Sequence, residues 1–136
     1  MTKVFVDTDI CLDVLTGRKP YHVMAERLFS LADLGKIEVY VSSLCFANID
    51  YILTQQYKRK DSRQAIAKFK TLVNVLSVDD KIIELSIASN FNDFEDAIQY
   101  NTAIENNLQI LITRNTKDFK KAKIKIMTPD VFMAKS

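Results

Sequence analysis

Acidic residues stand at three places where an apolar stretch of the sequence begins or ends. Asp7 comes directly after a short β-branched run, and Asp118 follows a second apolar run near the other end of the chain. Asp93 and Asp96 stand at the start of a helical pattern between them. Carboxylates with no Cys or His near them suit a hard cation such as Mg²⁺ or Mn²⁺ rather than zinc. Such an ion lowers the pKa of a bound water and holds phosphoryl oxygens, so the pattern favours metal-assisted phosphodiester chemistry.

Each of these acids also has a plain structural explanation. Asp93 and Glu95 favour the positive end of a helix and are typical of its first turn. Asp118 could cap a short helix, and Asn115 could be a turn residue. Asp96 is harder to explain in this way. Asp93 precedes it by three residues, so both carboxylates share one helix face and repel each other unless a cation lies between them.

Short apolar runs that alternate with helical patterns predict the elements that position these acids. The predicted strands cover residues 4–6, 37–41, 75–78, 108–113 and, more weakly, 123–127. The predicted helices run from an Asp9 cap to Gly17, over 21–34 with Gly35 as the stop, over 44–53 after a Ser42-Ser43 cap, from Ser62 to 73, from Asp79 or Asp80 to 87, from Asn92 or Asp93 to 104, and from Pro129 to 133. Strands alternating with helices imply a three-layer α/β/α fold with a central parallel sheet of four to five strands. One domain is expected to cover residues 1–136.

This topology would bring the acids together. In a parallel sheet, the strand C-termini and the N-termini of the helices that follow them lie at one edge, where ligands bind. Asp7 and Asp118 both follow strands, and the helix from Asp93 runs antiparallel to the strand after it. All three places are therefore expected at the same edge of the sheet.

Composition narrows the function classes. The chain has 136 residues with 19 Lys and Arg against 17 Asp and Glu, a balance too even to indicate nucleic-acid binding by charge alone. Two basic clusters could still contact phosphates or simply be solvated. The first cluster contains Lys58, Arg59, Lys60 and Arg63. The second contains Lys117, Lys120, Lys121, Lys123 and Lys125.

No apolar run is long enough to span a bilayer, and the N-terminus lacks the pattern of a signal peptide. Cys11 and Cys45 have no metal or redox spacing and are expected to be reduced core thiols of a cytoplasmic protein. His22, the one histidine, is expected at a helix start rather than in catalysis.

Four motifs, in this order, resemble those of the PIN domain, the nuclease fold of the VapC toxins of toxin–antitoxin pairs. They are V-F-V-D-T-D at Val4–Asp9, V-S-S-L-C-F-A-N at Val41–Asn48, D-F-E-D-A at Asp93–Ala97 and I-T-R-N-T-K-D-F at Ile112–Phe119. They span nearly the whole chain, and the last is the most specific. The third and fourth are similar to those of a bacterial subgroup of small single-domain PIN proteins.

The resemblance implies a Mg²⁺- or Mn²⁺-dependent endoribonuclease, a hydrolase in which metal-activated water cleaves RNA. It implies Asp7, Asp96 and Asp118 as catalytic metal ligands, with Asp93 as an additional acid. Thr113 and Asn115 would be polar support. No organic cofactor is implied, and the partners would be RNA and an antitoxin protein. The helices that carry Tyr51, Leu53 and Tyr57 could form a homodimer surface or belong to the core.

One position departs from the family pattern, and it keeps other interpretations open. Asn48 stands where the family usually has a Glu, so the site brings one charge fewer. A catalytically weakened module that binds RNA or protein is therefore the alternative to an enzyme. A weaker alternative is a phosphoryl-transfer enzyme with Asp7 as covalent nucleophile, although the chain has no Gly-rich phosphate loop.

Overall fold

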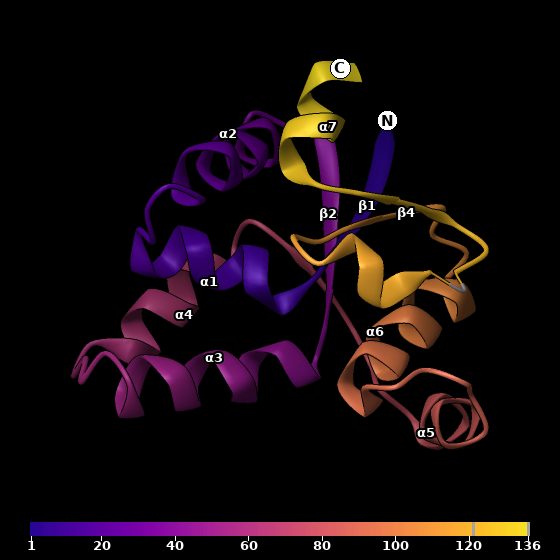
Figure 1. The fold of residues 1–136 in the computed structure, drawn as a ribbon. Coiled ribbons are helices and arrows are strands. Elements are labelled where there is room, and N and C mark those ends of the chain that lie inside the picture. Colours follow the sequence, from indigo (N-terminus) through magenta and orange to yellow (C-terminus); the bar gives the residue numbers. More distant parts are fainter. Residues whose placement is uncertain (121, 136) are drawn as a thin grey trace.

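A parallel sheet of five strands forms the middle of the protein (Figure 1). The computed structural model describes residues 1–120 and 122–135. The strands are β1 (Thr2–Val6), β2 (Ile37–Ser42), β3 (Asn74–Leu76), β4 (Ile110–Ile112) and β5 (Lys125–Met127). Their order across the sheet is β3-β2-β1-β4-β5, and every neighbouring pair is parallel. The first strand of the sequence is therefore the central strand of the sheet.

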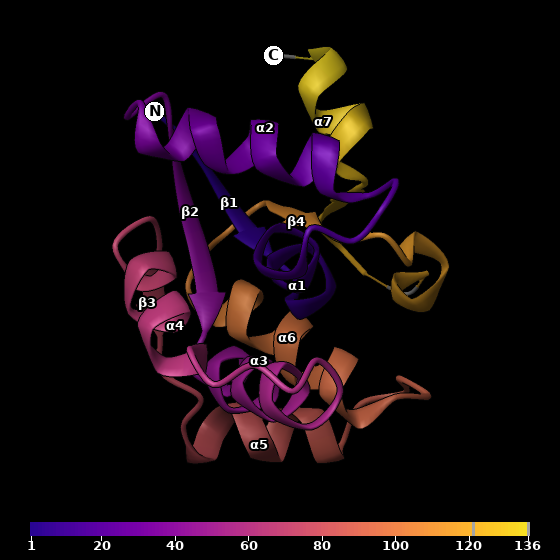
Figure 2. The same cartoon turned by 90° about the vertical axis from the view of Figure 1, so that its left-hand side faces the viewer.

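Helices cover both faces of the sheet, as Figures 1 and 2 show. They are α1 (Thr8–Thr16), α2 (His22–Asp33), α3 (Leu44–Gln55), α4 (Ser62–Lys70), α5 (Asp80–Ile87), α6 (Phe94–Glu105), the 3₁₀ turn η1 (Thr116–Phe119) and α7 (Pro129–Lys135). Val4 and Val6 of β1 pack into one core with α1, α2, α3 and α7, whereas Phe5 packs into a second core with α6 and η1. This alternation follows from the strand period of two. The three-layer α/β/α prediction is confirmed.

Helix ends largely follow the predicted signals. Gly17 (φ +64°) ends α1 and Gly35 (φ +72°) follows α2, both in the left-handed conformation that glycine adopts without cost. The side chain of Asp79 caps α5. The prediction of an Asp9 cap for α1 is wrong, because Asp7 Oδ1 accepts from Thr8 N at 2.8 Å and Asp9 lies in the first turn.

Two predictions around β2 are right only in part. Ser43 is the N-cap residue of α3, as predicted, but its side chain makes no capping bond, because its hydroxyl accepts a hydrogen bond from Val78 N instead. The third strand covers residues 74–76 rather than 75–78. Its last pair joins Leu76 to Ser42, where β2 itself ends, so residues beyond 76 have no strand to pair with.

No helix among the described residues is long and apolar enough to cross a membrane. Cys11 and Cys45 are buried and free, as expected. His22 is the first residue of α2, which confirms its predicted place. In the first basic cluster, Arg59 is held by Asp61 and by the Leu15 carbonyl. Lys121 of the second cluster lies outside the described residues.

Candidate active site

A cavity of about 440 Å³ opens at the edge of the sheet where β1 and β4 end. Its wall includes every acid predicted to form a site, which are Asp7, Asp93, Asp96 and Asp118, together with Asn48 and Asn115. Asp9 and Glu95 also line it. Thr113, the remaining predicted residue, is fully buried behind this wall. We call this cavity the acidic cleft. The prediction that distant acids meet at one rim of the sheet agrees with this placement.

Asp7 forms the buried floor of the acidic cleft, with 7% of its surface exposed. The apolar β1 strand carries it there, because its carboxylate follows directly after Val6. Asp7 Oδ1 accepts from Thr8 N at 2.8 Å and from Gln99 Nε2 at 3.3 Å, and Oδ2 accepts from the Thr113 hydroxyl at 2.9 Å. The side chain is thus fixed from three elements. A carboxylate so buried and hydrogen-bonded is poorly placed to act as a covalent nucleophile.

Asp9 lies beside Asp7, on the first turn of α1. Its Oδ2 accepts from Arg114 N at 3.1 Å, which ties α1 to the segment after β4. Its Oδ1 is buried and has no hydrogen-bond partner among the described residues. A buried, unpaired carboxylate oxygen is costly unless it binds a ligand. Asp9 is therefore a candidate site residue, whereas the sequence pattern favoured a capping role for it.

The start of α6 supplies the opposite wall. Asp93 caps the helix, since its Oδ1 accepts from Asp96 N at 3.0 Å. The structural explanation of Asp93 thus holds, and its carboxylate faces the acidic cleft as well. Glu95 Oε1 accepts from Asn48 Nδ2 at 3.0 Å, so Asn48 binds an acid of the cleft as a donor. Asp50, two residues after Asn48, does not line the cleft and accepts from the Ser62 hydroxyl instead.

Burial and mutual repulsion raise the pKa values of these acids. Burial, followed by the neighbouring charge of Asp9, raises the pKa of Asp7 to about 7, against the hydrogen bonds from Thr113 and Thr8. Burial, then the charges of Asp93 and Asp118, raises the pKa of Asp96 to about 7. A cation placed among these carboxylates would stabilise their charged forms, which burial and mutual repulsion make unfavourable.

The donor set of the acidic cleft fits a hard divalent cation. All of its candidate ligands are carboxylate or amide oxygens, and one buried oxygen, Asp9 Oδ1, lacks a partner. Among the described residues, no three acidic, histidine or cysteine side chains already form a closed ligand cluster. Without a bound cation the carboxylates repel one another, so their side chains are expected to lie farther apart than metal ligands do.

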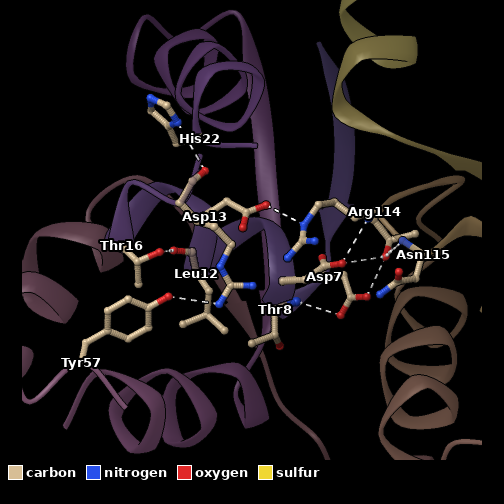
Figure 3. Close-up of polar contacts among 12 residues, drawn as sticks. Asp7, Thr8, Leu12, Asp13, Thr16, His22, Tyr57, Arg114 and Asn115 are labelled. Atoms are coloured by element: carbon tan, nitrogen blue, oxygen red, sulfur yellow. Dashed lines mark hydrogen bonds and ion pairs between the residues drawn. The ribbon is translucent and has the colours of Figure 1, made fainter. Parts of the chain in front are cut away.

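Sequence reasoning missed two groups of residues behind the cleft. Gln99 of α6 is fully buried and its Nε2 reaches both Asp7 and the Thr8 hydroxyl. Asp13 is also fully buried and accepts from Arg114 Nε at 2.8 Å (Figure 3). The Arg114 guanidinium lies 4.1 Å from the centre of the Tyr21 ring. A helical period places Gln99 one turn after Asp96, which is the sequence signal that could have identified it.

We expect the free energy of unfolding of the metal-free protein to fall as the pH rises from about 4 to about 7. Between about pH 4 and pH 7, folded Asp7 and Asp96 keep protons that the unfolded chain has lost, so stability falls as pH rises through this window. Urea unfolding in EDTA, at several pH values from about 5 to 8, measures this slope. Asp7→Asn should make the slope shallower. A stability that is flat or rises over this range would contradict the prediction.

Comparison with known proteins identifies a matching family and several similar proteins. The model of the family described as PIN domain matches residues 3–117. Among curated proteins, Ribonuclease VapC1 of Aquifex aeolicus (strain VF5) is 27% identical over 138 residues, covering 96% of this chain and 92% of that protein.

Solved structures share the fold. A chain of a toxin–antitoxin complex from Klebsiella pneumoniae is 25% identical with a TM-score of 0.70, and the match covers 93% of this chain and 97% of that chain. A chain of DNA-bound VapBC from Salmonella typhimurium has a TM-score of 0.70 at 18% identity, covering 95% of this chain and 99% of that chain. At 18% identity the second likeness supports the fold alone.

Proposed function

The chain belongs to the PIN domain family, and from this premise we propose that it is a Mg²⁺- or Mn²⁺-dependent endoribonuclease. The observation that carries the proposal is the acidic cleft, in which carboxylates from the junction of β1 and α1, the start of α6 and η1 line one cavity. The ribonuclease name of the Aquifex aeolicus relative supports RNA as the substrate. Two buried free thiols, Cys11 and Cys45, suit the reducing cytoplasm as its location.

Asp7, Asp96 and Asp118 would hold the metal ion, with Asp93 or Asp9 as an additional acid. When bound, the ion supplies an activated water and neutralises charge on the phosphoryl oxygens. The chain's own residues keep the carboxylates in place. Thr113 and Gln99 orient Asp7 by hydrogen bonds. Asn115 lines the cleft next to Asp118 as polar support.

Basic side chains next to the acidic cleft would bind the RNA backbone. A cavity of about 370 Å³ shares Asp93, Asp96 and Asp118 with the cleft and is also lined by Lys117 and Lys120. Lysines beside a metal-binding wall can hold the phosphates that flank the cleaved bond. We favour single-stranded RNA, because its backbone can be splayed for in-line attack.

We further propose that the protein is the toxin of a toxin–antitoxin pair and forms a homodimer. The solved relative from Klebsiella pneumoniae is a toxin–antitoxin complex, and an antitoxin here would cover the acidic cleft. Tyr51 and Tyr57 expose 63% and 38% of their surfaces, so they can belong to a dimer surface. Leu53 cannot, because it is fully buried in the core.

Metal-dependent cleavage tests the proposed enzyme. Purified protein should cleave single-stranded RNA in Mg²⁺ or Mn²⁺ and lose this activity in EDTA. Mn²⁺ should also raise the melting temperature of the protein, and this rise should vanish in Asp7→Asn. RNA binding without cleavage and without a metal effect would instead support the non-catalytic module. The bond from Asn48 to Glu95 favours that alternative, since Asn48 here contributes a donor instead of a negative ligand.

Asp93 is expected to replace part of the charge that Asn48 does not provide. Asp93→Asn retains a good helix cap and removes only the charge, so the protein should fold normally. We expect Mn²⁺ to bind at least about tenfold more weakly, the loss typical of removing a group that supports a metal site. Calorimetric titration with Mn²⁺ measures this. Metal binding and cleavage unchanged in Asp93→Asn but abolished in Asp96→Asn would refute the compensation.

A further inference from the structure

We propose that a second cavity, beside the acidic cleft, binds one nucleobase of the RNA, and that guanine is the base it fits. This inference rests on the proposed ribonuclease function and deepens it. The cavity has a volume of about 500 Å³ and lies between the start of α2, the segment after β4 and the start of α7. We call it the base pocket. The residues that define it are Pro20, Tyr21, Met24, Arg114, Pro129 and Asp130.

The base pocket adjoins the acidic cleft. Asn115 lines both cavities, so the two adjoin at this residue. Its neighbour Arg114 belongs to the base pocket, while the Arg114 backbone N donates to Asp9 of the cleft. A nucleotide strand whose phosphate lies in the cleft therefore has a neighbouring nucleotide at the base pocket. A base bound there would fix which phosphate reaches the carboxylates.

One part of the pocket suits the flat face of a base. Tyr21, Met24 and two prolines supply apolar surface, and Tyr21 remains 46% exposed. Arg114 is stacked against the Tyr21 ring, 4.1 Å from its centre. Aromatic rings are surfaces on which proteins stack unpaired bases of single-stranded RNA, and Tyr21 is the ring that this pocket offers.

The polar groups of the pocket match the edges of guanine. Asp13, fully buried, accepts from Arg114 Nε and so fixes the guanidinium (Figure 3). Among the described residues, the terminal amino groups of Arg114 have no hydrogen-bond partner, and Arg commonly donates to guanine O6 and N7. Asp130 is exposed in the first turn of α7, where its carboxylate also bonds the Thr128 side chain, and its remaining acceptor positions can accept from guanine N1–H and the 2-amino group. Guanine alone combines two acceptors with two donors on adjoining edges.

Titration with mononucleotides tests the pocket independently of catalysis. The experiment is two-dimensional NMR on metal-free protein, to which 5′-GMP, AMP, CMP and UMP are added in separate titrations. GMP should shift the signals of Tyr21, Met24 and Asp130, with an affinity at least about fivefold above the other three, the low end for one bidentate contact. No GMP-induced shift in the pocket, or equal effects of all four nucleotides, would overturn the proposal.

Matched variants locate the effect. Met24→Trp fills the pocket and should abolish the GMP shifts, whereas Val23→Trp places the same ring on the same turn, at a residue that is exposed and outside the pocket. Asp130→Asn should remove the preference for GMP without affecting the core. Asp80→Asn, also in the first turn of a helix, is its control and should retain the preference. A GMP preference that survives in Asp130→Asn counts against the proposal.

Cleavage mapping then separates this inference from the proposed function. On a random single-stranded RNA pool in Mn²⁺, the wild type should cut at a fixed offset from guanine, and Asp130→Asn should cut without this preference. Cutting with no base preference overturns the base pocket and leaves the nuclease intact. Absence of cutting alongside GMP-specific shifts refutes the nuclease and supports the pocket.

Discussion

Replacing Asp7 with asparagine is expected to slow RNA cleavage about a thousandfold. Asp7 is the proposed metal ligand that the fold holds most firmly, with hydrogen bonds from Thr8, Gln99 and Thr113. Loss of several kcal/mol of metal-based stabilisation corresponds to roughly three decades in rate, at about 1.4 kcal/mol per decade. Initial rates on single-stranded RNA in saturating Mn²⁺ measure the effect.

The same substitution should not unfold the protein. Burial already disfavours the charged form of Asp7 and raises its pKa to about 7, so a neutral amide of the same shape removes an unfavourable charge. Asp50→Asn is the matched control, because Asp50 binds the Ser62 hydroxyl and does not line the acidic cleft. It should retain full activity. An Asp7→Asn protein that is folded and within tenfold of wild-type activity would refute the metal-ligand role.

Arg114→Met is expected to be the most destabilising single change outside the apolar core. Arg114 Nε donates to the fully buried carboxylate of Asp13, at 2.8 Å. Removing the arginine leaves a buried charge unpaired, which typically costs about 3–5 kcal/mol. The free energy of unfolding from urea titration at neutral pH measures the loss.

A double variant shows whether the buried charge is the cause. Arg114→Met combined with Asp13→Asn removes both charges and should recover most of the lost stability. Lys81→Met is the surface control. Its partner is Glu105, and the lysine side chain is 70% exposed, so the unfolding midpoint should barely change. Equal losses in the single and double variants would show that packing, rather than charge, explains the effect.

Much of the fold and of the candidate site followed from short-range patterns. The β-branched run before Asp7 and the glycines after α1 and α2 are local signals, and they predicted the element order correctly. A parallel sheet then places strand ends at one edge, which is why Asp7 and Asp118 could be expected in one cavity. This expectation needed only the order of the elements.

The missed residues depend on details that such patterns do not contain. Whether Gln99 faces Asp7 depends on the rotation of α6 about its axis, and whether Arg114 reaches Asp13 depends on how the segment after β4 crosses α1. Asp9 was assigned the capping role that Asp7 performs, because two acids one residue apart give the same signal. The contacts of Gln99 with Asp7 and of Arg114 with Asp13 are tertiary, between residues 92 and 101 positions apart.

The position of β1 has a consequence for how the acidic cleft fluctuates. β1 is hydrogen-bonded to a strand on each side, whereas Asp118 lies in a four-residue 3₁₀ turn that follows the short strand β4. A segment held by few contacts unfolds locally more often than one held by many. The η1 turn should therefore open far more often than the central strand β1. The side of the cleft that carries Asp7 is thus held firmly, whereas the side that carries Asp118 opens and closes more often. The proposed cation or RNA strand would therefore exchange past η1 while Asp7 keeps its place.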